Sequence, residues 1–284
     1  MLRLALPILL LVACRSGPPR APVNAASASG TEASAAAPSL FDGHYALDRP
    51  DAVFALPGKL REVSGLTWGP GGMLTAIDDE HGRLYAIDPA TGAVTEGAAF
   101  GERGDYESVE RVGERTFVLR SDGALFEDGR LLASGVPPGC DAEGLAHDAQ
   151  AGRLLIACKG GAGGARAVYA FDLAGRRLQS RPAYAIPANP GRAPGAPAGA
   201  ASVGRFRPSG LAFDAGTGDL YVVSANRPAV AVFRRDGTLR AAFALDASIL
   251  PQPEGIAIGP DGTLYVASEK GNGRAPRLAV FRRR

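Results

Sequence analysis

Five segments of this chain share one opening phrase, and this internal repeat constrains its fold more than any other feature. In chain order the phrases are EVSGLTWGPGG, YESVERVGE, AEGLAHDAQAG, PSGLAFDAGTG and PEGIAIGPDG. Two β-rich phrases follow each of them, such as TLYVASEK and RLAVFRRR in the last unit. The aligned positions, spaced by 43, 36, 66 and 45 residues, are Ser64, Glu107, Glu143, Ser209 and Glu254. Units of about 45 residues with short strands are typical of propeller blades.

The repeat therefore predicts an all-β fold, a five-bladed β-propeller over residues 41–284. Abundant glycine (38 residues) and proline (22 residues) favour short strands joined by turns. We expect a fourth strand in blades 1, 3 and 4, whereas the last blade ends after its third strand. The segment 44–57 is then a spare strand, and its pairing with blade 5 closes the ring and covers an exposed edge. An open β-sandwich is the alternative, but it does not explain the repeated phrase.

The chain begins MLRLALPILLLVAC, and its apolar stretch is about half of the roughly 20 residues that a membrane-spanning helix needs. The end of this stretch, LVAC, resembles a bacterial lipobox, so residues 1–13 are predicted to be a cleaved signal peptide and Cys14 a lipidated residue. Arg15 follows the cysteine in place of aspartate, which favours the outer membrane, with the protein facing the periplasm. The alternative is a plain secretory leader with an incidental cysteine.

Two segments are rich in small residues and proline. Residues 14–40 contain no aromatic side chain. Such a segment cannot bury enough apolar surface to offset the entropy lost on ordering, so we expect a flexible tether. Residues 186–204 (IPANPGRAPGAPAGAASVG) are expected to form a surface insertion within the propeller.

The net charge is only +2, from 31 basic and 29 acidic residues, so no nucleic-acid partner is expected. We expect a monomer that contacts the membrane through Cys14 and offers its channel face to an unknown protein or small-molecule ligand.

Several phrases carry a family resemblance: E-x-S-G-L-T, D-D-E-x-G-x-L-Y-x-I-D, G-D-Y-E and P-E-G-I-A-I-x-P-D-G-T-L-Y-x-x-S-E. In content and order they resemble the SdiA-regulated family of bacterial envelope β-propellers over about residues 54–284. The resemblance implies a five-bladed, calcium-binding propeller that is distantly similar to NHL-repeat proteins. Blade 4 departs from the pattern, because Pro208 and Ser209 replace an acidic opening.

Propeller topology places the start of each opening phrase at the rim of the central channel. The predicted metal site is a ring of three carboxylates and two hydroxyls, namely Glu107, Glu143, Glu254, Ser64 and Ser209. Further acids are expected around the rim: Glu62, Asp105, Asp141, Asp79, Glu80 and Glu269. An all-oxygen set without histidine or cysteine suits calcium, the cofactor we predict. The alternative is a solvated ring neutralised by Arg61, Arg120 and Arg207.

Two functions remain open on these residues. The first is a non-catalytic, calcium-binding envelope lipoprotein. The second is a calcium-dependent lactonase or esterase that uses the acidic channel face, similar to gluconolactonase-type propellers. No catalytic residue is assigned, since the chain has no nucleophile elbow and no zinc or P-loop motif. His81 could accept a proton at the channel mouth or simply cap its hairpin loop.

Cys140 and Cys158 lie in the same blade. A regular hairpin between the first two strands of blade 3 places Cys158 opposite Glu143, three residues from Cys140. That separation is too long for a disulfide unless the preceding loop folds back, so the spacing favours two unbridged thiols and leaves a disulfide open as the alternative.

Overall fold

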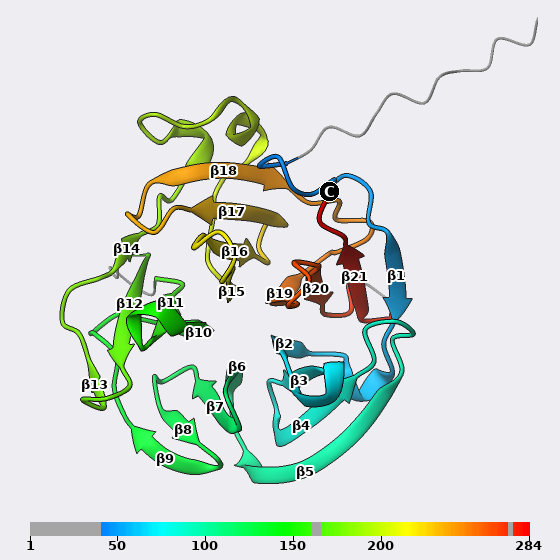
Figure 1. Cartoon of the computed structure of the whole chain (residues 1–284), viewed down its shortest axis with the longest axis vertical. Helices are drawn as coiled ribbons and strands as arrows, with labels where there is room; N and C mark the ends of the chain where they lie inside the picture. The colour runs from blue at the N-terminus through cyan, green and yellow to red at the C-terminus, as the bar shows by residue number, and fades with distance from the viewer. Residues whose placement is uncertain (1–40, 161–165, 272–274) are drawn as a thin grey trace, which may run out of the picture. The chain divides into compact units, whose positions relative to one another are not determined.

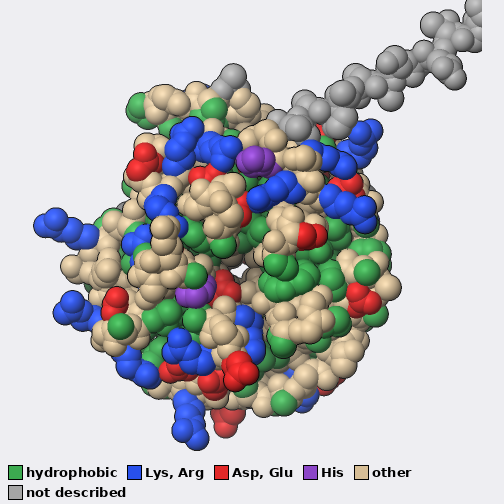
Figure 2. Space-filling view, viewed as in Figure 1, with side chains coloured by type: hydrophobic (Ala, Val, Ile, Leu, Met, Phe, Trp, Pro, Cys, Tyr) green, Lys and Arg blue, Asp and Glu red, His purple; other side chains and the backbone are tan. Residues whose placement is uncertain are grey.

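The computed structural model describes residues 41–160, 166–271 and 275–284, and the predicted leader and tether lie outside these residues. Five antiparallel sheets surround a central channel, so the predicted five-bladed propeller is confirmed (Figure 1). A narrow opening is visible at the centre of the ring (Figure 2). None of the helices in the described ranges is long and apolar enough to cross a membrane.

The strands of each blade are given in order from the channel outward. The strands of blades 1 and 2 are β2 (Val63–Trp68), β3 (Leu74–Asp78), β4 (His81–Ile87) and β5 (Val94–Arg103), then β6 (Tyr106–Val112), β7 (Arg115–Arg120), β8 (Leu125–Glu127) and β9 (Arg130–Ala133). Blade 2 thus has a fourth strand that the sequence pattern did not reveal, because β9 has only four residues and the first two, Arg130 and Leu131, are exposed.

The later blades follow the same order. Their strands are β10 (Ala142–Asp148), β11 (Arg153–Cys158), β12 (Ala167–Asp172), β13 (Arg177–Leu178) and β14 (Tyr184–Ala185) in blade 3, β15 (Gly210–Phe213), β16 (Leu220–Ser224), β17 (Ala229–Phe233) and β18 (Leu239–Ala244) in blade 4, and β19 (Pro253–Ile258), β20 (Leu264–Ser268), β21 (Arg277–Phe281) and β1 (Ala52–Ala55) in blade 5. Five short 3-10 helices connect them: η1 (Gly58–Leu60), η2 (Pro70–Gly72), η3 (Ala149–Ala151), η4 (Pro190–Arg192) and η5 (Ala198–Ser202).

The N-terminal strand closes the ring, as the repeat predicts. β1 pairs antiparallel with β21, with Ala52 opposite Val280 and Ala55 opposite Arg277. The chain just before β1 is also anchored, since the Tyr45 hydroxyl donates to the carbonyl of Gly262 at 2.7 Å. Phe41, Tyr45 and Leu47 are buried in the apolar cluster that blades 4 and 5 share. The closure therefore uses side-chain packing as well as a strand ladder.

Apolar side chains fill the spaces between neighbouring blades. There are five clusters among the described residues, one for each interface between adjacent blades. This arrangement explains why the second strands, such as LYVVS in β16 and LYVAS in β20, are buried along their whole length. Both faces of such a strand meet another blade, so its sequence is continuously apolar and does not alternate. Ile186, Ala200 and Val203 of the predicted insertion join the cluster between blades 3 and 4.

A glycine in four of the five repeats lets the inner strands approach one another. A Cβ atom at Gly210 would lie 2.0 Å from the carbonyl oxygen of Glu254 on the next inner strand. We expect Gly210→Ala to lower the free energy of unfolding by about 3 kcal/mol, because backbone must move to admit the methyl group. Gly58→Ala is the control, since nothing lies within 4 Å of its Cβ position. Urea denaturation measures both, and equal midpoints would contradict the close approach.

The expectation of unbridged cysteines is wrong. Cys140 and Cys158 form a disulfide with their Cα atoms 4.9 Å apart. The register explains the error: Ala142 lies opposite Cys158, and Glu143 is an extra residue before Gly144 pairs with Ala157. This bulge shortens the path, and the preceding turn, in which the Cys140 N–H donates to the Pro137 carbonyl, brings the first cysteine to the second.

The disulfide closes a loop with a sequence separation of 18 residues. Replacing both cysteines with serine is expected to lower the free energy of unfolding by about 3 kcal/mol, because the crosslink restricts the unfolded chain. Denaturation of the wild-type protein with and without reductant provides the comparison. A reductant that leaves the wild-type midpoint unchanged would show that the crosslink contributes nothing to stability.

Candidate functional site

The predicted ring residues occupy the same irregularity in successive inner strands. In blades 1, 2, 3 and 5 the pairing with the second strand skips one residue, and the skipped residue is Ser64, Glu107, Glu143 and Glu254 respectively. In blade 4, Ser209 precedes β15, and its N–H donates to the Val223 carbonyl at 2.9 Å. A bulge leaves its extra residue out of the ladder and redirects its side chain, as is common near functional sites.

The two serines of the ring join neighbouring blades. The Ser64 hydroxyl donates to the carbonyl of Tyr106 at 2.6 Å, and the Ser209 hydroxyl donates to the carbonyl of Pro253 at 2.8 Å. In both cases the acceptor precedes a ring glutamate. Both serines are buried and hold the glutamate-bearing strands in place.

The three ring glutamates interact electrostatically at the channel mouth. Burial, followed by repulsion from Glu143 and other acids, raises the pKa of Glu107 to about 10. Burial also raises the pKa of Glu143 to about 7 and that of Glu254 well above its ordinary value, and Glu143 adds to the second shift. The three carboxyl groups are therefore near enough to influence one another electrostatically, and their ionised forms are unfavourable without added positive charge.

A lysine supplies part of that charge. Lys159 Nζ lies 2.5 Å from Glu143 Oε1, and Glu143 is only 2 % exposed. Lys159 also lowers the pKa values of Glu107 and Glu254 from the levels that burial alone would give. The sequence did not identify Lys159 as the partner of Glu143, because spacing within one blade does not say which rim side chains turn inward.

Lys159 belongs to a second ring just beyond the first. Backbone N–H groups of four equivalent residues donate to carbonyls two residues before the first-ring positions, and these residues are Asp79, Ser121, Lys159 and Glu269. Burial, then repulsion from Glu62, raises the pKa of Asp79 to about 6. Burial, then repulsion from Asp79, raises the pKa of Glu269 to about 7. Blades 1 and 5 thus contribute acids where blade 3 contributes a cation.

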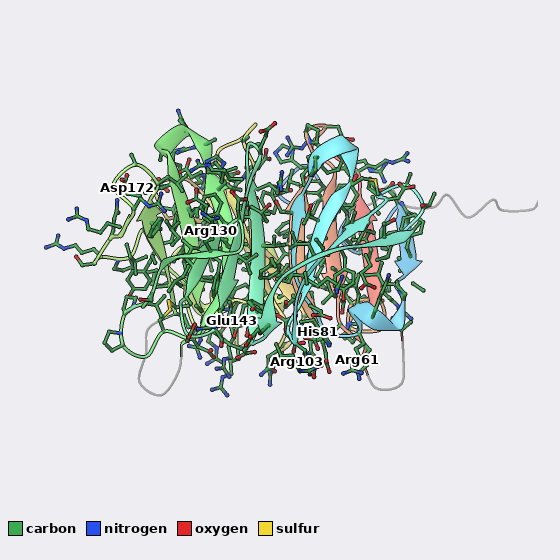
Figure 3. All side chains as sticks on the ribbon, turned by 90° about the horizontal axis from the view of Figure 1, so that it is seen from below. Arg61, His81, Arg103, Arg130, Glu143 and Asp172 are labelled. Carbon is green, nitrogen blue, oxygen red and sulfur yellow. A yellow bond between two sulfur atoms is a disulfide. The ribbon has the colours of Figure 1, made fainter. Side chains whose placement is uncertain are left out.

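The remaining rim acids have partners on the surface. Glu62 lies 3.3 Å from Arg61 Nε, Glu80 accepts from Arg103 Nη2 at 2.8 Å, and Asp105 accepts from the Ser121 hydroxyl at 2.5 Å. The backbone carbonyl of Asp141 accepts from the N–H of Lys159. Glu143, Arg61, Arg103 and His81 lie toward one face of the disc, and Asp172 lies toward the other (Figure 3).

The three arginines proposed to neutralise the ring have different positions. Arg61 pairs with Glu62 and with Glu80, at 3.5 Å from the latter. Arg120 pairs with Asp122 at 2.7 Å, and Arg207 Nη2 donates to the Gly160 carbonyl at 3.3 Å. Among the described residues, the ion pair within the ring itself is made by Lys159.

His81 is held by Asp78. The backbone N–H of His81 donates to Asp78 Oδ1 at 2.8 Å, and its Nδ1 lies 3.1 Å from Asp78 Oδ2. The other ring nitrogen, Nε2, lies 3.1 Å from Arg103 Nη1. Asp78 therefore caps the hairpin loop and also orients the imidazole beside the acidic rim.

A cation fits the chemistry of this mouth, although the side chains are not gathered around one point. The donors are oxygen atoms, several carboxyl groups have raised pKa values, and the buried Asp79 Oδ1 has no hydrogen-bond partner in the described part of the chain. Within those same residues, no three acidic, histidine or cysteine side chains converge closely enough to hold a metal ion. Binding would require Lys159 to release Glu143.

Part of the chain matches a known protein family. Residues 207–272, which include blade 4 and the first two strands of blade 5, match the model of the SdiA-regulated family. The SdiA-regulated resemblance is confirmed. No curated protein matches the chain.

Several solved structures resemble this propeller in fold. A protein described as a candidate gluconolactonase is 16% identical, with a TM-score of 0.50, over 80% of this chain and 77% of that one. A gluconolactonase from Xanthomonas campestris is 13% identical, with a TM-score of 0.49, over 84% and 97%. Regucalcin from Agrobacterium tumefaciens, a calcium-binding protein, is 19% identical, with a TM-score of 0.48, over 86% and 94%. At these identities the likeness concerns the fold.

Proposed function

We propose that this protein is an envelope lipoprotein whose propeller binds calcium at the channel mouth and serves as a binding module. The observation that carries the proposal is the bulge that recurs in the inner strands at Glu107, Glu143 and Glu254, whose carboxyl groups influence one another electrostatically. Glu107, Glu143 and Glu254 would hold the ion, together with Asp79 and Glu269 of the second ring. Calcium accepts roughly 6–8 oxygen ligands in irregular arrangements, which suits donors from different blades.

Calcium would supply the positive charge that this mouth lacks. Lys159 is one cation among several carboxyl groups, and the pKa values of these groups stay raised in its presence. A divalent ion would favour their ionised forms and release Lys159 toward solvent, where its ammonium group is well hydrated.

Melting experiments test calcium binding. A ligand that binds only the folded state stabilises it by about 2.7 kcal/mol at a hundredfold excess over Kd, so calcium should raise the melting temperature and chelator should lower it. Glu143→Gln should reduce this response, whereas Glu114→Gln, an exposed site in the turn between β6 and β7, should preserve it. A wild-type protein that melts identically with calcium and with chelator would refute calcium binding.

The envelope location rests on the leader and on Cys14. We propose that lipidated Cys14 anchors a monomeric propeller to the outer membrane, facing the periplasm, with its channel face open to a protein or small-molecule partner. The mature protein should fractionate with membranes and enter the detergent phase, and Cys14→Ser should release it or leave the leader uncut. A Cys14→Ser variant that stays in the membrane at its normal size would contradict lipidation.

A calcium-dependent lactone or ester hydrolase is the second candidate. The observation that favours it is the Asp78–His81 pair, which places an oriented imidazole beside the acidic rim. A screen of lactones and esters, with calcium and with chelator, separates the two functions. Calcium-dependent turnover that His81→Gln abolishes would support the hydrolase, and calcium binding without turnover would support the binding module.

A further inference from the structure

A cavity opens on the channel-mouth face, on the side away from the acidic residues of blade 1. It has a volume of about 480 Å³ and lies between blades 4 and 5. Its lining includes Lys159, Arg207 and Arg227, the amide side chains of Asn226 and Gln252, and Glu254. The blade 1 side of the mouth is acidic, with Glu62, Asp79 and Glu80, so the mouth carries opposite charges on its two sides.

The two arginines of this cavity have no acidic partner. Neither Arg207 nor Arg227 forms an ion pair with a carboxylate in the described ranges. Arg207 Nη2 donates to the Gly160 carbonyl, which fixes the guanidinium, while its Nε is buried and lacks a hydrogen-bond partner in the same part of the structure. An unpaired buried donor is costly, and an anion would satisfy it with a charge-assisted hydrogen bond.

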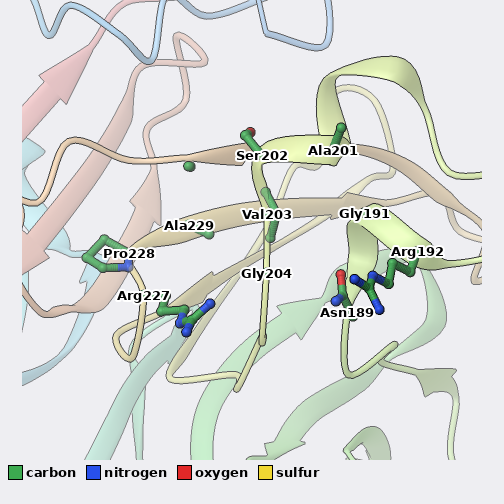
Figure 4. Close-up of a pocket in the computed structure, with 11 residues that line it drawn as sticks. Asn189, Gly191, Arg192, Ala201, Ser202, Val203, Gly204, Arg227, Pro228 and Ala229 are labelled. Atoms are coloured by element: carbon green, nitrogen blue, oxygen red, sulfur yellow. The ribbon is translucent and has the colours of Figure 1, made fainter.

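Arg227 is held in an unusual backbone conformation. Its φ is +70°, in the left-handed region that costs an L-residue roughly 1–2 kcal/mol, and it lies in the turn between β16 and β17. This turn also lines a neighbouring cavity of about 440 Å³, which the insertion forms with blade 4 (Figure 4). Arg227 and Pro228 line both this cavity and the one between blades 4 and 5. Arg227 is therefore accessible at the boundary of two open spaces.

We propose that the cavity between blades 4 and 5 binds the carboxylate of a small hydroxylated acid, with Arg207 and Arg227 as its anion-binding residues. A guanidinium matches the two oxygens of a carboxylate, and the amides of Asn226 and Gln252 can bond to hydroxyl groups. This cavity adjoins the proposed calcium site, since Ser209 and Glu254 of the ring line it as well, but its two arginines are not among the calcium-binding residues.

Calorimetric titration of the full chain tests the proposal, in chelator and at constant ionic strength. The probes are tartrate, erythritol as its neutral counterpart, and inorganic phosphate. We expect tartrate to bind and erythritol not to bind. Arg207→Gln and Arg227→Gln should each weaken tartrate binding by about tenfold, the loss expected for one charge-assisted contact.

Arg234→Gln is the matched control, because Arg234 is an exposed arginine of the same blade at the other end of β17, and it should leave tartrate affinity unchanged. Arg227 is exposed, so its replacement tests the site even if Arg207→Gln fails to fold. Absence of tartrate binding, or an equal loss in the Arg234 variant, would overturn the proposal. Binding of phosphate in preference to tartrate would overturn its carboxylate assignment.

Discussion

A chain that lacks residues 15–57 is expected to aggregate, because it loses every element that closes the ring. The deletion removes β1 from the edge of β21 and leaves the hydrogen-bonding groups of that edge unpaired. It also removes Phe41, Tyr45 and Leu47 from the cluster between blades 4 and 5. At roughly 1.5–3 kcal/mol for each buried side chain, the loss approaches the whole stability of a typical domain, which is about 5–15 kcal/mol.

Deletion of residues 15–38 is the matched comparison, since it leaves Phe41 and the rest of the closing segment intact. Its thermal midpoint should equal that of the full chain. Light scattering and thermal melting measure both variants. A soluble protein with the same midpoint after deletion to Pro57 would show that the N-terminal segment does not close the propeller.

Without a divalent cation, the stability of the wild-type protein is expected to fall as pH rises from about 5 to 8. The carboxyl groups of Glu107, Glu143 and Glu269 have pKa values raised to about 10, 7 and 7 from an ordinary value of 4.5. At pH values between 4.5 and the raised pKa values, the folded protein keeps protons that the unfolded chain has lost. Each unit increase in pH over this range therefore lowers the free energy of unfolding. The contribution is intact below pH 4.5 and is lost as pH rises through the folded-state values.

Replacing Glu107 with glutamine should remove the largest part of this dependence. We expect Glu107→Gln to be more stable than the wild-type protein at pH 8 in chelator, by about 2 kcal/mol, and nearly equal to it at pH 5. Glu114→Gln, in the exposed turn that follows the same strand, should follow the wild-type curve. Parallel curves for Glu107→Gln and the wild-type protein would show that burial of this carboxyl group carries no proton linkage.

The sequence predicts the architecture well because the determinants repeat. Five copies of one phrase set the number of blades, and the unfinished last copy identifies 44–57 as the closing strand. In four blades a glycine follows the ring position and permits the close approach of the inner strands, as at Gly210. Docking of Phe41 and Tyr45 could not be predicted, since both residues precede the repeat and contact blades that are distant in sequence.

The site is predicted in position more than in detail. Topology alone brings Glu107, Glu143 and Glu254 to one axis. The bulge at Glu143 has no signature in a single strand, so it misled the pairing of the cysteines. The contact between Lys159 and Glu143 depends on which way a long side chain turns, and the spacing of residues along the chain does not determine that direction.

Calorimetry of calcium binding in buffers with different ionisation enthalpies tests the central claim most directly. If calcium binds to glutamates whose pKa values are raised, binding at pH 7 must release protons, and the measured heat must vary with the buffer. We expect release of about one proton or more per ion, and a smaller release from Glu107→Gln. Failure of calcium to bind, or a binding heat that is the same in every buffer, would contradict a calcium site built from these carboxyl groups.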